Sequence, residues 1–184
     1  IGVGNMGSGH IENIVAGKCP EIEVTAIADR KEDRRQWAIE KLPDVAVFTE
    51  GEDLIKSDAC DAILIAVPHY QHPGLAMMGF ANGKHVMCEK PMAKTAEDAR
   101  RMVAAAKESG KKLTIGYQHR HKPETQYLKQ VIDSGELGDI YYAKALAIRR
   151  RGTPNWGVFL NEYEQGGGPL IDIGTHSLDL TLYL

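Results

Sequence analysis

The chain has 184 residues, 43% of them hydrophobic and 26% charged, and a formal net charge of −3. This composition indicates a globular protein with one large domain or one and a half ordinary ones, and the weak charge gives no general attraction to nucleic acid or anionic membranes. No apolar stretch reaches the ~18 residues that a membrane span needs. The three cysteines, Cys19, Cys60 and Cys88, are widely spaced, which indicates neither a disulfide framework nor a metal site and predicts a reducing, cytoplasmic location.

Segments with strand and helix patterns alternate over the first part of the chain. Apolar runs predict strands at residues 1–3, 22–28, 45–48, 62–67, 85–88 and 113–117. Predicted helices lie between them at 6–16, 32–41, 52–56 and 71–82. A further helix lies between a capping box, Thr95 with Asp98, and a stop at Gly110, with an apolar face shared by Ala99, Met102, Val103 and Ala106. Repeated strand–helix–strand units predict an α/β fold with a doubly wound parallel sheet, whose ligand crevice lies beyond the carboxyl ends of the strands.

The pattern changes near residue 120, where we place a boundary between a domain at 1–120 and a second at 121–184. Pro123 begins a predicted helix whose inward face holds Tyr127, Leu128, Val131 and Ile132. Residues 140–151 form a predicted long strand, and Pro169 begins a last helix. One long strand with one or two helices cannot form a closed hydrophobic core, and a strand of that length needs neighbouring strands to pair with. We therefore expect the second domain to be incomplete and the chain to be a piece of a longer protein.

The strongest motif is a glycine turn at the start of the chain. Gly2, Gly4 and Gly7 form G-x-G-x-x-G, with Asn5 and Met6 between the last two glycines. Such glycines allow a tight strand-to-helix turn, close approach of a pyrophosphate and close packing of helix on strand. The pyrophosphate then lies at a helix N-terminus, where amide groups and the helix dipole favour negative charge.

An acidic residue follows the glycine turn at the distance that nucleotide binding requires. Asp29 ends an apolar run about 20 residues on, where a carboxylate can accept hydrogen bonds from ribose hydroxyls. A carboxylate repels a 2′-phosphate, which favours NAD, whereas Arg30 beside it leaves NADP open.

Further candidate residues stand just past predicted strand ends. These are Pro68, His69 and His72, then Glu89 and Lys90, then Gln118 and Arg120. Lys90 could donate a hydrogen bond to a substrate hydroxyl and favour its ionisation. Alternatively, it is a surface lysine paired with Glu89.

The last helix carries a second candidate group. Asp172 and His176 are four residues apart and share one face, with Asp179 one turn later. A carboxylate beside a histidine suits proton abstraction, but an ordinary polar pair at a helix start fits equally well. Trp156 is either a core residue or a platform for a ring-shaped substrate. His69, His72, His119 and His121 lack the spacing of a metal motif, so we expect no metal.

Taken together, these motifs resemble the glucose–fructose oxidoreductase / inositol dehydrogenase (Gfo/Idh/MocA) family. The matching pieces are 2–7, the strand ending at Asp29, 66–68 with His72, 88–91, 116–117 with Arg120, 134–138, and 166–168 leading to Asp172, Gly174, His176 and Asp179. The resemblance implies a Rossmann domain followed by an α/β domain with a large open sheet. The outer face of that sheet often makes the interface of a homo-oligomer, a dimer or a tetramer. It implies NAD, or NADP, and hydride transfer between nicotinamide and a sugar or polyol carbon.

The resemblance also implies roles for individual residues. It assigns Lys90, Asp172 and His176 to catalysis, and Lys90, Arg120, Trp156, Asp172 and His176 to substrate binding. It assigns cofactor binding to Gly2, Gly4, Asn5, Met6, Gly7, Asp29, Arg30, Pro68, His69, His72, Glu89, Lys90 and Gln118. Two positions depart from the family pattern, His69 and Gln118, where many members have Asn, so the nicotinamide pocket is expected to be reshaped.

The sequence thus predicts an NAD(P)-dependent dehydrogenase acting on the CH–OH group of a sugar or inositol-like polyol. Two alternatives stay open at this point. One is a glycosidase that uses NAD for transient oxidation of its substrate, and the other is a non-catalytic dinucleotide sensor. The expected partner is a small molecule, with no nucleic acid and no membrane.

Overall fold

The chain folds as two compact units, Ile1–Ile115 and Gly116–Leu184, which are described separately. The computed structural model describes every residue except 149, 153, 156 and 158. No helix in the described part of the chain is long and apolar enough to cross a bilayer.

Short parallel strands form the centre of the first unit. β1 (Ala26–Ala28) pairs with β2 (Ala46–Phe48), and β4 (His85–Cys88) pairs on one side with β3 (Ala62–Ile65) and on the other with β5 (Leu113–Ile115). The strands are shorter than several of the apolar runs that predict them, but the parallel α/β arrangement is confirmed.

Residues 1–3 connect the two groups of strands. The Gly2 amide donates to the Ala28 carbonyl at 2.8 Å, and the Ala66 amide donates to the Ile1 carbonyl at 2.8 Å. The spatial order is therefore β2, β1, residues 1–3, β3, β4, β5. Strand order reverses on the two sides of residues 1–3, and such a reversal opens a crevice at the carboxyl ends of the neighbouring strands.

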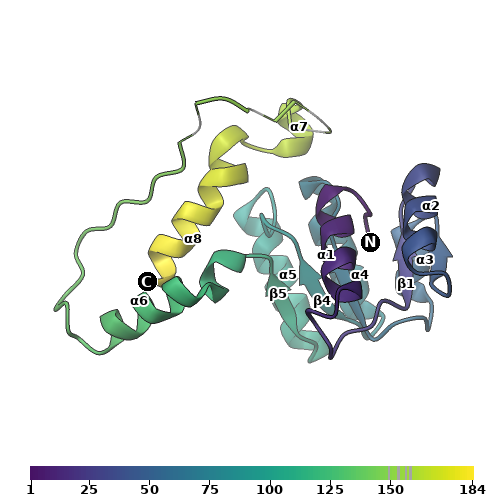
Figure 1. The fold of residues 1–184 in the computed structure, drawn as a ribbon, viewed down its shortest axis with the longest axis horizontal. Coiled ribbons are helices and arrows are strands. Elements are labelled where there is room, and N and C mark those ends of the chain that lie inside the picture. Colours follow the sequence, from purple (N-terminus) through teal and green to yellow (C-terminus); the bar gives the residue numbers. More distant parts are fainter. Residues whose placement is uncertain (149, 153, 156, 158) are drawn as a thin grey trace. The chain divides into compact units, whose positions relative to one another are not determined.

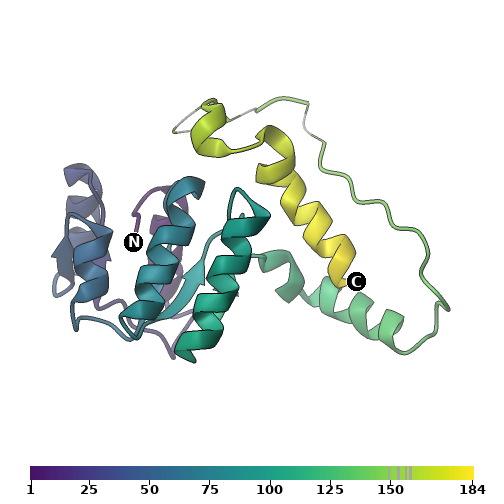
Figure 2. The same cartoon turned by 180° about the vertical axis from the view of Figure 1, so that it is seen from behind.

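Helices cover both faces of this sheet. α1 (Asn5–Val15) lies in front of the strands in Figure 1, whereas α4 (His72–Ala81) and α5 (Ala96–Ser109) lie in front of them in Figure 2. The smaller helices α2 (Glu32–Lys41) and α3 (Gly51–Lys56) follow β1 and β2. Burial of side chains on both sides of the sheet explains why its strands are apolar almost throughout. The fully buried members include Ile55, Ile65, Cys88 and Met102.

The ends of α5 follow the local signals in its sequence. The Thr95 hydroxyl accepts a hydrogen bond from the Asp98 amide at 3.1 Å, and Gly110 ends the helix in the left-handed conformation, with φ of 67°. Met102 and Ala106 are buried as predicted, but Val103 is 40% exposed. The apolar face of α5 is thus narrower than its sequence indicates, because the sheet covers only one side of the helix.

The second unit is mostly helical. A 3-10 turn, η2 (Gln118–His121), leads into α6 (Pro123–Asp133). After residues 134–161 come α7 (Glu162–Gln165), a π-helical stretch η3 (Leu170–Gly174) and α8 (Thr175–Tyr183).

Two predictions for this unit are wrong in the described residues. The segment 140–148 forms no strand, because a strand needs a hydrogen-bonded neighbour and none lies beside it in the part of the unit that the structure describes. On α6, Tyr127 and Leu128 are 69% and 40% exposed instead of facing inward, since no described element covers that face.

Candidate active site

The glycine turn has the shape that a bound phosphate group requires. Gly2 has φ of +84°, and a Cβ there would lie 2.6 Å from the Ala66 carbonyl oxygen. A Cβ at Gly7 would collide with the carbonyl oxygen of Gly2, so α1 packs against the turn at the closest distance that the backbone permits. A Cβ at Gly4, in contrast, would meet nothing within 4 Å. The turn is therefore tight on its inner side and open on its outer side.

The open side of the turn faces the start of α1. Gly4 is the N-cap of this helix, Asn5 is exposed and Met6 is 50% exposed. The first amide groups of a helix have no partner within the helix, and together with the helix dipole they attract anions. The geometry fits the pyrophosphate of a dinucleotide.

Asp29 lies next to the glycine turn, directly after β1. Its Oδ2 accepts a hydrogen bond from the Val3 amide at 2.7 Å, and its Oδ1 accepts one from the Lys31 amide at 2.8 Å. Each carboxylate oxygen has a second acceptor position, which leaves capacity for the hydroxyls of a ribose.

The neighbouring cation Arg30 is held by another acid. Its Nε donates to Glu50 Oε2 at 2.8 Å, and this hydrogen bond raises the pKa of the guanidinium above its usual range. Asp29 and Glu50 make this position acidic, which disfavours a phosphate group there.

His72 joins two strand-end segments of the first unit. Its ring is fully buried, with Nδ1 2.8 Å from the Pro91 carbonyl oxygen and Nε2 2.9 Å from the Val67 carbonyl oxygen. Burial lowers the pKa of His72 and outweighs the two carbonyl oxygens, which raise it. Its neighbour His69 begins a short 3-10 turn and is also buried, with ring centroids 5.8 Å apart. Both rings lie in the segment that follows β3, and their contact with a cofactor stays a prediction.

Glu89 and Lys90 stand at the carboxyl end of β4. Glu89 is buried, and its Oε1 lies 2.8 Å from His10 Nε2 on α1. Burial raises the pKa of Glu89, but the hydrogen bond and charge of His10, together with the amide and charge of Lys90, lower it by more. Lys90 is half-buried, and the Lys90–Pro91 peptide bond is cis. Glu89 is therefore not a surface acid: it is buried and pairs with His10, and the charge of Lys90 acts on it as well.

In the second unit, His176 lies in an aromatic cluster near the start of α8. The His176 side chain is 7% exposed. The His119 ring stacks on it with centroids 5.0 Å apart and an interplanar angle of 24°, and the Tyr117 ring meets it edge-on at 6.1 Å. The Tyr117 hydroxyl is also within 2.9 Å of Thr175 Oγ1. The imidazole that the sequence marks as an acid–base group is thus fixed by two neighbouring rings.

Arg120 binds Asp179 instead of standing alone. The two side chains form a bidentate ion pair, with Nε donating to Oδ2 at 2.9 Å. The hydrogen bonds that Arg120 donates to Asp179 raise the pKa of Arg120 above its usual range. The guanidinium also lies over the Tyr183 ring, 5.0 Å from its centroid. This pair connects η2 to α8, and substrate contact by Arg120 stays a prediction.

Asp172 lies in the π-helical stretch before α8. In a π-helix the hydrogen bonds join residues five apart, so a spacing of four falls just short of one turn instead of just beyond it. The positions of Asp172 and His176 therefore still share one face of the helix. Wide turns of this kind occur frequently at functional sites.

Gln165 has a positioning role that the sequence pattern did not single out. Its side chain is buried, and its Oε1 accepts hydrogen bonds from the amides of Gly167 and Gly168 at 3.1 and 2.6 Å. Its Nε2 donates to the Gly168 carbonyl at 3.0 Å. The amide side chain thus determines the path of the glycine run that leads to Asp172. A glutamine directly before three glycines was the available signal.

The predicted residues fall into two groups, one in each unit. The first unit holds the glycine turn, Asp29 and Lys90, and the second holds His176 with its neighbours; Gln118, at the start of η2, is exposed. Trp156 lies outside the described residues. Among the described residues, no group of three or more His, Cys, Asp or Glu is arranged to hold a metal ion.

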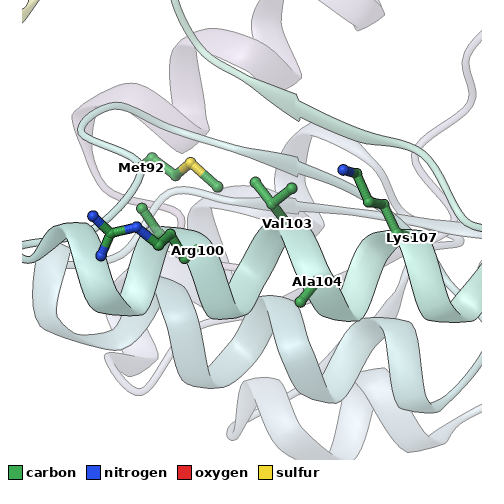
Figure 3. A pocket seen from close by; sticks show the side chains of 6 residues that line it. Met92, Arg100, Val103, Ala104 and Lys107 are labelled. Carbon is green, nitrogen blue, oxygen red and sulfur yellow. The ribbon is translucent and has the colours of Figure 1, made fainter.

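A separate hollow of about 400 Å³ runs along α5. Figure 3 shows Met92 and Val103 over its middle, with Arg100 and Lys107 on either side. It has none of the glycine-turn residues in its lining, so it is distinct from the nucleotide crevice.

Comparison with known families shows which family the chain belongs to. Residues 1–117 match the family model described as "Oxidoreductase family, NAD-binding Rossmann fold", and residues 125–184 match the "GFO/IDH/MocA C-terminal domain". The chain belongs to the Gfo/Idh/MocA oxidoreductase family. Its first unit is the NAD-binding Rossmann domain of that family, in agreement with the fit of the glycine turn and Asp29 to a dinucleotide.

Several Gfo/Idh/MocA relatives are similar over most of the chain. D-glucoside 3-dehydrogenase of Escherichia coli is 40% identical over 167 residues, which are 89% of this chain and 47% of the relative. The WlbA dehydrogenase of Bordetella pertussis, solved with NADH and UDP-GlcNAcA, matches with a TM-score of 0.89 and 29% identity over 100% of this chain and 57% of its own. The scyllo-inositol dehydrogenase of Lactobacillus casei, solved with NAD(H) and scyllo-inositol, matches with a TM-score of 0.71 and 27% identity over 75% and 41%. The chain thus spans about half the length of these relatives.

Proposed function

We propose that the full-length protein is an NAD-dependent dehydrogenase that oxidises a CH–OH group of a sugar or polyol. The observation that carries this proposal is the open outer side of Gly4 at the N-terminus of α1, with Asp29 bonded to the Val3 amide of the same turn. Lys90 follows the carboxyl end of β4 in the same unit. That arrangement supplies a place for a dinucleotide and a cation on the same edge of one sheet. The three relatives described above are dehydrogenases, and this favours the proposal over the redox-assisted glycosidase and the non-catalytic sensor.

The proposed chemistry assigns one task to each charged or titratable group. His176 accepts the proton of the substrate hydroxyl, which suits an imidazole near neutral pH. The Lys90 ammonium donates a hydrogen bond to the same oxygen and stabilises its developing negative charge. Asp172 orients the substrate and the imidazole. The bound nicotinamide supplies the hydride acceptor. Lys90 belongs to the first unit and the other two to the second, and their meeting at one carbon is part of the proposal.

The substrate class follows from the relatives. One acts on D-glucosides, one is bound to scyllo-inositol, and one is bound to a nucleotide sugar. Ring-shaped polyhydroxylated molecules are common to all three. Because the chain is similar to D-glucoside 3-dehydrogenase over 89% of its length, glucosides are the first substrates to test.

We also propose that the full-length protein assembles as a dimer or a tetramer through its second domain. Several large apolar side chains of the second unit are exposed, among them Leu137, Ile140, Tyr141, Tyr142 and Leu146. Apolar surface of this extent is normally covered by protein, here by the rest of the second domain together with a second copy of the chain. Light scattering on the purified full-length protein tests the proposal, and a monomer at all concentrations would contradict it.

The function is tested by incubating full-length protein with NAD and a panel of glucosides, free sugars and inositols while NADH absorbance is followed. Substitution Lys90→Ala is expected to lower kcat by roughly 10²–10⁴-fold, because the developing alkoxide loses its hydrogen-bond donor. A matched control is Lys112→Ala, an exposed lysine at the amino-terminal end of β5, for which kcat should not change.

The same assay separates the alternatives. Release of an aglycone from a chromogenic glucoside without accumulation of NADH would indicate the glycosidase. NAD binding without turnover of any compound in the panel would indicate the sensor. Full activity of the Lys90→Ala variant would remove Lys90 from the mechanism.

A further inference from the structure

Two histidines from distant parts of the sequence stack face to face in the second unit. The rings of His119 and His176 have centroids 5.0 Å apart and are tilted by 24°. His176 is buried, whereas His119 is half-buried and lies closer to solvent. The side chain proposed to take the substrate proton is therefore covered on one ring face by a second imidazole.

The stack is held in place by neighbouring contacts. Arg120 follows His119 directly in η2, and Asp179 lies three residues after His176 on α8. The Arg120–Asp179 ion pair therefore joins the same two elements as the histidine stack. On the other side of the stack, Tyr117 contacts the edge of the His176 ring and reaches Thr175 with its hydroxyl. His119 thus has a defined place against His176.

From this geometry we infer that His119 is a positioning residue for His176. It holds the plane of the His176 imidazole and, when it carries a proton itself, opposes protonation of His176. His119 thereby determines the pH below which His176 stops acting as a base. The inference rests on the acid–base role proposed for His176, and the stack itself is independent of that role.

The charged and titratable groups around the stack lie on three elements. The elements packed against the start of α8 are η2 and η3. Their titratable or charged residues are His119, Arg120 and His121 on η2 and Asp172 on η3, and α8 itself adds Asp179 and Tyr183. Asp179 is neutralised by Arg120 in the bidentate pair, and His121 is exposed. A carboxylate such as that of Asp172 favours a protonated imidazole close to it. A protonated His119 has the opposite effect on His176, because like charges in close contact oppose each other's ionisation.

The test compares full-length variants at position 119. In His119→Gln the acid limb of the pH profile of kcat/KM should move to higher pH by about half a unit or more, since a like charge is removed. In His119→Arg, where a planar guanidinium keeps the stack and a permanent charge, the limb should move to lower pH. His121→Gln, the neighbouring exposed histidine, is the matched control and should leave the profile in place.

A second measurement makes the result independent of turnover. The proton NMR titration of the His176 ring, assigned by its loss in His176→Gln, should shift in the same directions in the two His119 variants. Coincident titration curves in wild type, His119→Gln and His119→Arg would overturn the inference. Shifted curves in a protein without dehydrogenase activity would keep the stack effect and reject the proposed function. Circular dichroism establishes that each variant is folded, and one folded variant is enough to show the direction in which the His176 titration shifts.

Discussion

At the scale of single residues, Asp29 is the side chain that we expect to distinguish between the two nicotinamide cofactors. Its carboxylate is fixed by the amides of Val3 and Lys31 beside the glycine turn, while Arg30 is occupied by Glu50. Asp29→Ala removes the negative charge expected to repel a 2′-phosphate and the acceptor proposed for the ribose hydroxyls. The ratio of kcat/KM for NADP to that for NAD should rise by about tenfold or more, equal to about 1.4 kcal/mol or more of altered discrimination. Asp33→Ala, an exposed acid on α2, is the control, and an unchanged ratio in Asp29→Ala would place the ribose elsewhere.

At the scale of elements, the Glu89–His10 pair joins the end of β4 to α1. The pKa of Glu89 is lowered in the folded protein, so its contribution to stability is present above the unfolded carboxyl pKa of about 4.3 and is lost as pH falls through the lower folded value. The midpoint of thermal unfolding should therefore fall between about pH 5 and pH 3 more steeply in wild type than in Glu89→Gln. Near neutral pH, Glu89→Gln should lower the free energy of unfolding by about 1–2 kcal/mol, because the hydrogen bond between the buried carboxylate and His10 is weakened.

The control for this pair is an acid of the same length on the surface. Glu97 lies in the first turn of α5, with its side chain 76% exposed in a loose pair with Arg100. Glu97→Gln should change the free energy of unfolding by less than about 0.5 kcal/mol. Equal pH dependence in wild type and Glu89→Gln would show that the link between β4 and α1 is not electrostatic.

At the scale of the whole molecule, the two units differ in what lies at their centre. The first unit contains two clusters of buried apolar side chains, one around Ile65 and Met102 and one around Val3 and Ile27. In the described part of the second unit, the buried side chains are polar: Thr125, Gln165, His176 and Asp179. Large apolar residues there, such as Tyr141 at 97%, are exposed.

This difference predicts how the parts behave when separated. A fragment of residues 1–115 should unfold cooperatively in urea and bind NAD, since it contains the core and the glycine turn. A fragment of residues 116–184 should show no cooperative transition by circular dichroism, because it buries too little apolar surface to offset the loss of chain entropy. A cooperative transition in the second fragment would mean that it has a core of its own.

The amino-acid sequence by itself determined the features that depend on neighbouring residues. The glycine turn, the position of Lys90 after an apolar strand, and the ends of α5 at Thr95 and Gly110 follow from local backbone preference and side-chain period, and the parallel α/β fold follows from their repetition. Only the tertiary structure decided which distant side chains meet. It brought His119 onto His176, Arg120 onto Asp179 and His10 onto Glu89, left 140–148 without a strand neighbour, and turned Tyr127 outward. The physical reason is that a periodic pattern specifies which face of an element is apolar, whereas the partner of a ring, a charge or a strand edge depends on the packing of segments far apart in the chain.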